Sequence, residues 1–113
     1  MKNYYLGILV TAVAVLAAAI TLPSAQKGDA TAGKDVFTKK CKICHGADGA
    51  GNPAIAKALG VTFKPLGSDE IQKKTDTDFK KIITEGTGKM KPVKDITDAD
   101  MDNVIAFVRT LKK

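Results

Sequence analysis

Both cysteines of this chain and its only histidine lie within five consecutive residues, Cys41-Lys42-Ile43-Cys44-His45. On a helical backbone Cys41 and Cys44 lie on one face, because side chains three residues apart are neighbours on a helix surface. Two thiols in this register can reach the two vinyl groups on one edge of a porphyrin, and the adjacent His45 can turn under the ring to ligate its iron. The motif predicts a covalently attached c-type haem around which the rest of the chain must fold.

Other uses of these three residues fit the sequence poorly. A structural zinc site needs four ligands, and the chain has only three cysteine and histidine residues in total. A dithiol redox motif of the thioredoxin kind belongs to a βαβ pattern, which the sequence does not show. A disulfide between Cys41 and Cys44 would close a very short loop, contribute little stability and leave His45 without a role.

The N-terminal residues have the layout of a secretory signal. Lys2 supplies an early positive charge, residues 4–22 carry no charged side chain, and Pro23-Ser24-Ala25 supplies a break with small residues. We therefore assign residues 1–25 as a signal peptide and expect export to the periplasm, the compartment in which haem of this kind is attached. The apolar segment of 19 residues is also long enough to span a bilayer. An uncleaved anchor in the inner membrane is therefore the alternative.

Cleavage after Ala25 would leave residues 26–113, which we assign as one domain of 88 residues. A chain of this size builds only a modest hydrophobic core and often needs an additional stabilising group, such as a disulfide or a bound cofactor. A covalently bound porphyrin would fill this role. Without Lys2 these residues carry 17 Lys and Arg against 12 Asp and Glu, a net charge of about +5.

Helix signals divide residues 26–113 without any convincing strand pattern of period two. The start signals are N-caps and capping boxes, and they fall at Asp29 or Thr31, Asn52-Pro53, Ser68, Thr75-x-x-Asp78 and Thr97-x-x-Asp100. The first four helices should lead to Cys41, Gly60, Lys74 and Gly86. Apolar residues then recur at helical spacing in the last helix, from Met101 to Leu111. We expect an all-α fold whose terminal helices pack on each other.

The second axial position of the iron cannot be filled by a histidine of this chain, because His45 is the only one. Methionine, lysine or an open position remain. Met101 falls in the apolar stripe of the last helix, which favours a core position. Met90 instead lies in a loop, after Gly88 and before Pro92, and has no helical stripe to join. We expect its thioether to bind the iron opposite His45 and to stabilise ferrous over ferric iron. The alternative ligands are the flanking lysines, Lys89 and Lys91.

From Gly28 to its C-terminus the chain resembles the small monohaem class I cytochromes c of bacteria. The resemblance rests on the approach Gly33-Lys34-x-Val36-Phe37, the glycine-rich loop after His45, the segment Gly86-x-Gly88-x-Met90 and the closing amphipathic helix. It implies a cytochrome c fold for residues 26–113, with the terminal helices packed around one haem c. It also implies an electron carrier, soluble or tethered, with His45 and Met90 as axial ligands.

We expect one-electron transfer between larger redox complexes, without substrate turnover, and therefore not an enzyme. Two alternatives stay open: a haem peroxidase-like or ligand-binding protein with an open sixth position, and a cytochrome subunit of a larger membrane redox complex. Six lysines flank the haem motif and the candidate methionine: Lys39, Lys40, Lys42, Lys89, Lys91 and Lys94. They would steer docking to acidic redox partner proteins or membrane redox complexes. We expect a monomer, and an exported haem protein would rarely meet nucleic acid.

Overall fold

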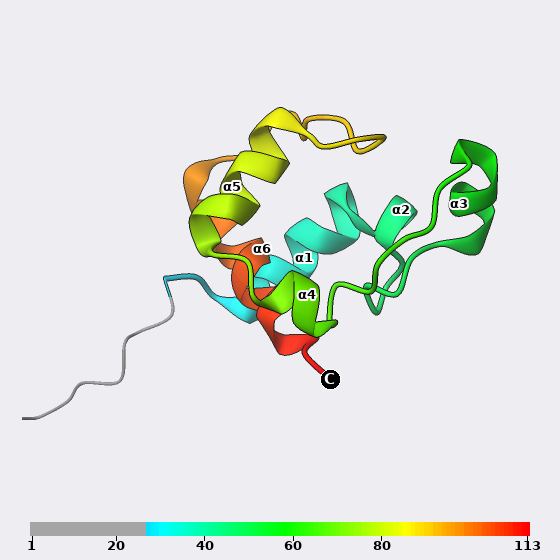
Figure 1. Ribbon diagram of the computed structural model, residues 1–113. Helices are drawn as coiled ribbons and strands as arrows, with labels where there is room; N and C mark the ends of the chain where they lie inside the picture. Colours follow the sequence, from blue (N-terminus) through cyan, green and yellow to red (C-terminus); the bar gives the residue numbers. More distant parts are fainter. Residues whose placement is uncertain (1–26) are drawn as a thin grey trace, which may run out of the picture.

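Six helices make up the part of the chain that this computed structural model describes, residues 27–113 (Figure 1). Their bounds are α1 Ala30–Lys40, α2 Lys42–His45, α3 Pro53–Leu59, α4 Asp69–Gln72, α5 Asp76–Glu85 and α6 Asp98–Thr110. Within this part there is no strand, and the only extended pairing is an isolated antiparallel bridge between Thr87 and Met90. The predicted all-α fold is confirmed. The predicted signal peptide, residues 1–25, lies outside the described residues.

The first long helix and α3 begin at the predicted caps. The Asp29 carboxylate accepts hydrogen bonds from two backbone amides in the first turn of α1. Asn52 caps α3 in the same way, Pro53 is the first residue of that helix, and Gly60 ends it in the left-handed conformation. Because caps satisfy the backbone groups that a helix end leaves free, even the seven-residue α3 has both of its ends bonded.

Capping boxes open α5 and α6, as predicted. At α5 the Thr75 hydroxyl accepts from the Asp78 N–H, and the Asp78 carboxylate accepts from the Thr75 N–H. Thr97 and Asp100 make the same reciprocal pair at α6. The hydrogen bond from the Thr75 backbone holds the pKa of Asp78 below its ordinary value, so the α5 box is fully formed at neutral pH.

Helix α4 is shorter than predicted, because it ends at Gln72 instead of Lys74, and the Ser68 hydroxyl makes no capping hydrogen bond. The chain leaves the helix because Thr75 is extended as the cap of α5. In addition, the Arg109 guanidinium occupies the carbonyl oxygens of Gln72 and Lys74. In a continued helix the Gln72 carbonyl would accept the hydrogen bond from the N–H of Asp76.

Helices α1 and α6 pack closely on each other and form the centre of the fold (Figure 1). Phe37 of α1 is 2% exposed, and its ring centroid lies 5.1 Å from that of Phe107 of α6 in a tilted arrangement. Val104 and Ile105 are buried on the same helix, together with Met101. The predicted packing of the terminal helices and the predicted core position of Met101 are both confirmed.

The α1–α6 packing is close because Gly33 has no side chain. A β-carbon at this position would overlap the backbone oxygen and carbonyl carbon of Asn103. The N–H of Asp29 also donates to Asn103 Oδ1 at 2.9 Å, so the start of α1 is bonded to the same turn of α6. The backbones of the two helices are therefore in direct contact at Gly33.

The other helices surround one side of this pair. Helix α5 packs on α6, where Lys80 lies 2.9 Å from carboxylate oxygens of both Asp98 and Asp102. Helix α3 contacts α2, and the loop after α5 reaches toward the α2–α3 part of the chain (Figure 1). No helix within residues 27–113 is both long enough and apolar enough to cross a membrane.

Candidate functional site

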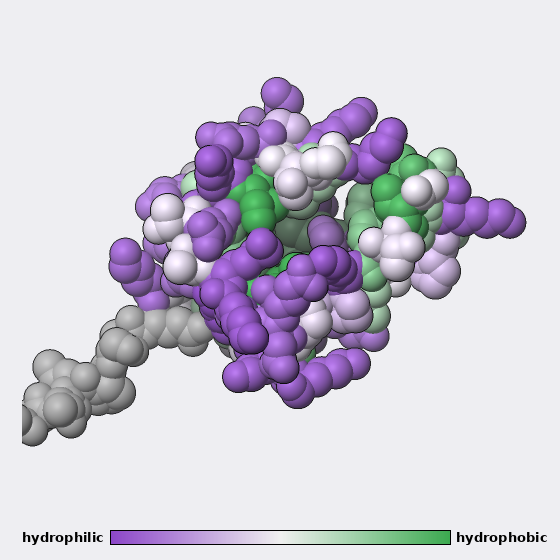
Figure 2. Space-filling model, in the orientation of Figure 1, coloured by the Kyte–Doolittle hydropathy of each residue, from purple (hydrophilic) through white to green (hydrophobic). Residues whose placement is uncertain are grey.

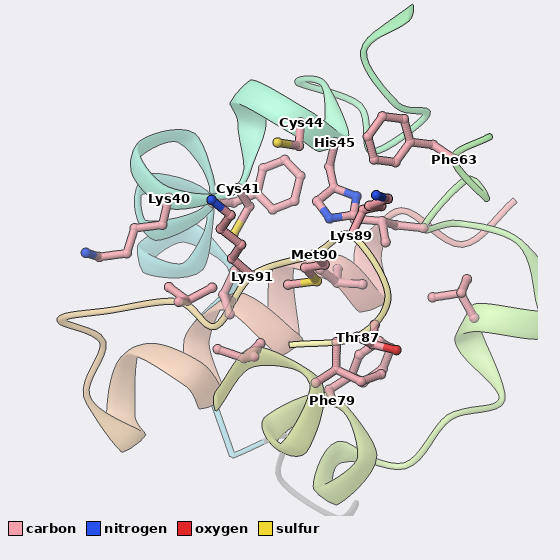
Figure 3. A pocket seen from close by; sticks show the side chains of 18 of the residues that line it. Lys40, Cys41, Cys44, His45, Phe63, Phe79, Thr87, Lys89, Met90 and Lys91 are labelled. Carbon is pink, nitrogen blue, oxygen red and sulfur yellow. The ribbon is translucent and has the colours of Figure 1, made fainter. Parts of the chain in front are cut away.

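A hydrophobic cavity of about 810 Å³ opens between the α1–α6 pair, α5 and the segment that carries α3 (Figure 2). Each of these parts contributes apolar side chains to its wall, including Phe37, Phe63 and Phe79. The predicted attachment cysteines and both predicted axial ligands also line it (Figure 3). Its volume and its mostly apolar wall suit a large organic ligand.

The Cys-Lys-Ile-Cys-His motif lies where α1 ends. Cys41 separates α1 from α2, and its carbonyl oxygen accepts hydrogen bonds from the N–H groups of Cys44 at 3.3 Å and His45 at 3.0 Å. This turn directs two free, partly buried thiols and the imidazole to one cavity. Burial raises the pKa of Cys41 to about 11. Its thiol is therefore protonated at neutral pH, unlike the nucleophilic thiols of dithiol redox proteins.

His45 ends α2 and is partly buried beside Phe63. The two ring centroids lie 5.6 Å apart, with their planes inclined at 58°. Burial lowers the pKa of His45, which favours the neutral imidazole that binds metals. The His45 Nδ1 atom is buried and has no hydrogen-bond partner among residues 27–113. Buried polar atoms are nearly always paired, so this ring fits a side chain that serves a bound group.

Met90 reaches the cavity from the loop that follows α5. Two backbone hydrogen bonds between Thr87 and Met90, of 3.0 and 2.9 Å, close a tight turn. Beyond it, the N–H of Val93 donates to the carbonyl oxygen of Ile83 at 2.8 Å and returns the chain to α5. In Figure 3, Met90 and His45 extend into the same cavity from these two separate segments.

The fold does not decide between Met90 and the alternative iron ligands, because Lys89 and Lys91 also line the cavity. Met101 does not line it. Phe63 also lines the cavity and was not predicted as a site residue. Its only signal is an aromatic side chain in a loop, outside any helical stripe.

Comparison with known proteins identifies the family of the chain. Residues 28–108 match the family described as cytochrome c oxidase, cbb3-type, subunit III. The chain belongs to this family of cytochromes c. Cytochrome c-554(547) of Halothiobacillus neapolitanus is 32% identical over 91 residues, covering 75% of this chain and 99% of the relative. Cytochrome c6 of Rippkaea orientalis is 32% identical over 105 residues, covering 88% and 86%.

A solved structure agrees with this assignment. The KustC0563 c-type cytochrome is 31% identical to the chain and superimposes with a TM-score of 0.61, over 72% of this chain and 98% of that one. The predicted cytochrome c fold is confirmed. Membership of the family implies a covalently bound haem c. The site fits such a group, because free thiols, a partly buried imidazole whose Nδ1 has no partner among residues 27–113, and a hydrophobic cavity occur together.

The cavity of this cytochrome c is bordered by positive charge. Seven lysines line it, here called the lysine rim: Lys39, Lys40, Lys64, Lys74, Lys89, Lys91 and Lys94. No Asp or Glu within residues 27–113 does so. Five of these lysines were predicted; Lys42 was predicted as well but does not line the cavity. In the turn from Cys41 to His45, the side chains of Cys41, Cys44 and His45 fall within one arc of about 100° on the helix surface, which leaves Lys42 and the 72% exposed Ile43 outside it.

Proposed function

We propose that this cytochrome c is an exported one-electron carrier whose haem is attached through Cys41 and Cys44 and ligated by His45 and Met90. The observation that carries the proposal is that two thiols, an imidazole and a thioether all line one hydrophobic cavity. The relatives named cytochrome c-554(547) and cytochrome c6 support haem-based electron transfer. When bound, the haem supplies a reversible ferric–ferrous couple.

The cysteines provide the attachment. Cys41 and Cys44 would hold the haem, each thiol adding across one vinyl double bond of the porphyrin, with the sulfur bonded to one carbon and the thiol hydrogen to the other. This addition needs no oxidant or reductant, and it requires the free thiols that Cys41 and Cys44 have. Because both lie on one turn of backbone, the two thioethers would restrict the ring to one orientation.

The axial ligands and the apolar wall set the redox behaviour. The neutral imidazole of His45 offers a nitrogen lone pair, and the soft sulfur of Met90 stabilises ferrous iron and raises the reduction potential. Phe37 and Phe79 keep part of the wall apolar, which limits access of water and raises the potential further.

The wall of the cavity favours a carrier over a haem enzyme. No carboxylate among the described residues lines it, and the one histidine of the chain is assigned to the iron. Neither a carboxylate nor a second histidine among the described residues is therefore available beside the sixth position as a general acid or base for peroxide chemistry.

The purified holoprotein tests the proposal. Haem should stay with the polypeptide after acid–acetone extraction, because thioether bonds survive it, and the double variant Cys41→Ala, Cys44→Ala should release it. The oxidised protein should show the Met–ferric charge-transfer band. Tight binding of cyanide or carbon monoxide in the absence of that band would contradict the carrier and support an open sixth position.

The description of the matched family favours a second candidate, a cytochrome subunit of a larger membrane redox complex. In this candidate the haem site is the same and residues 1–25 are retained as an anchor. Cell fractionation followed by N-terminal sequencing distinguishes the two. A carrier is recovered in the periplasm without residues 1–25, whereas the subunit is recovered in the membrane with Met1 or Lys2 at its N-terminus.

We further propose that the lysine rim steers docking to acidic redox partners. Changing three of its members to glutamine, Lys89, Lys91 and Lys94, should slow oxidation of the reduced protein by the anion hexacyanoferrate(III) about tenfold at low salt. The effect should shrink as salt is added, because exposed charges are screened. Stopped-flow measurement across a range of ionic strengths gives both quantities.

The matched control changes three exposed lysines that do not line the cavity, Lys57, Lys73 and Lys81, to glutamine. The control and the rim variant have the same net charge. If both slow the reaction equally, net charge and not the rim governs the encounter. If neither does, the docking proposal is wrong.

A further inference from the structure

The guanidinium of Arg109, near the C-terminal end of α6, binds the turn between α4 and α5. Its Nη1 donates to the carbonyl oxygen of Gln72, and its Nη2 donates to the carbonyl oxygen of Lys74 and to Asp76 Oδ1, each at 2.7 Å. It also lies 4.7 Å from the ring centroid of Phe79. One side chain thus holds two backbone carbonyls, a carboxylate and an aromatic ring of the adjoining segment.

A second side chain fastens the same segment to α6. Gln72 Nε2 donates to the carbonyl oxygen of Leu66 at 2.8 Å and to that of Val108 at 2.9 Å. Helix α4 makes no extensive contact with another helix. Segment 66–76 is therefore held at the C-terminal end of the chain by these hydrogen bonds, by one from the Lys113 N–H to the Gly67 carbonyl at 3.2 Å, and by a few apolar contacts with the core from Leu66 and Ile71. We call Arg109 and Gln72 the clasp.

The clasped segment is one wall of the proposed haem cavity. Leu66, Ile71 and Lys74 line the cavity, and so does Phe79, against which the guanidinium packs. Helix α5 begins at Asp76, which Arg109 holds, and its other end leads into the Met90 loop. The clasp therefore contacts both this wall and the start of the helix that leads into the Met90 loop.

Resting on the proposed function above, we propose that Arg109 is a positioning residue for the redox site, which keeps segment 66–76 and the start of α5 seated on α6. Local opening of a segment requires its bonds to break, and hydrogen bonds from a charged donor are among the strongest. While the wall is closed, water and foreign ligands are kept from the haem on this side. The apolar surroundings then favour the ferrous state and raise the potential.

The role requires a guanidinium. Its planar fork donates in several fixed directions at once, whereas a lysine ammonium is compact and carried on a flexible stem. Arg109→Lys therefore keeps the positive charge but loses the simultaneous bonds to Gln72, Lys74 and Asp76. Because the charge is kept, a change measured in this variant reflects lost positioning of the wall and not the electrostatic effect of the charge on the iron.

The test compares Arg109→Lys with the wild-type holoprotein. We expect imidazole to bind the ferric iron about tenfold faster. Loss of roughly one charge-assisted hydrogen bond should raise the population of the locally opened state by this factor. We also expect the reduction potential to fall. Lys80→Gln is the matched control, because Lys80 also joins α5 to α6 but does not line the cavity. It should leave the imidazole rate and the potential unchanged.

Wild-type values in Arg109→Lys, or equal changes in Lys80→Gln, would overturn the proposal. Gln72→Leu breaks the other half of the clasp and should change both measurements in the same direction. If Arg109→Lys fails to fold, Gln72→Leu decides. A failure of the proposed function is visible separately, because it would appear in the wild-type protein as extractable haem or as a missing Met–ferric band.

Discussion

We expect Gly33→Ala to lower the free energy of unfolding of the holoprotein by about 2–3 kcal/mol, the cost of overpacking a tight core. The added β-carbon would overlap the backbone of Asn103. Backbone atoms cannot rotate away as a side chain can, so α1 and α6 must separate. Alanine favours a helix over glycine by about 1 kcal/mol, and the overlap outweighs this gain. Thermal unfolding followed by circular dichroism should show a melting temperature lower by roughly 10–20 °C.

Asp35→Ala is the control for this substitution. Asp35 is an exposed residue of the same helix, so the variant makes a similar gain in helix propensity without approaching α6. It should melt within a few degrees of the wild type. If Gly33→Ala proved equally stable, the close contact between the terminal helices would not be needed to support the cavity.

Much of the helical framework could be predicted because the interactions at helix ends are local. Thr75 and Asp78 satisfy each other's backbone across three residues, and Thr97 and Asp100 do the same. A short stretch of sequence therefore contains the complete interaction. The haem motif is local in the same way, because one turn of backbone carries both thiols and the imidazole.

The features that could not be predicted depend on residues far apart in the chain. Helix α4 ends at Gln72 partly because of Arg109, 37 positions away. Phe63 reaches the His45 ring only through the path of the segment between them. Lys64 and Lys74 join the lysine rim for the same reason. Such contacts follow from the tertiary fold, and no cap or periodic pattern encodes them.

Lys42 shows the opposite error, in which closeness along the sequence suggested closeness in space. It lies between the two cysteines, yet it does not line the cavity. Helical periodicity explains the difference: at about 100° per residue, the side chains of Cys41, Cys44 and His45 fall within one arc of about 100° on the helix surface, and Lys42 falls outside it. The spacing that directs Cys41, Cys44 and His45 inward is the spacing that directs Lys42 outward.

Met90→Leu is expected to abolish the Met–ferric charge-transfer band and to lower the reduction potential by on the order of 0.1 V, a fraction of the roughly 0.8 V range that axial ligands cover. Leucine has nearly the volume of methionine, so the substitution removes the sulfur with little change in packing. Without the thioether, ferrous iron loses the ligand that stabilises it over ferric iron. Spectroelectrochemical titration of wild type and variant measures both effects.

Met101→Leu removes the other described thioether as a matched control. Met101 is 8% exposed in the core and does not line the cavity, so this variant should keep the wild-type band and potential. A wild-type spectrum in Met90→Leu would show that Met90 is not the ligand. Lys89→Gln and Lys91→Gln would then test the neighbouring amines. Because all three side chains line the same cavity, the ligand is the one whose removal changes the spectrum while removal of the other two does not.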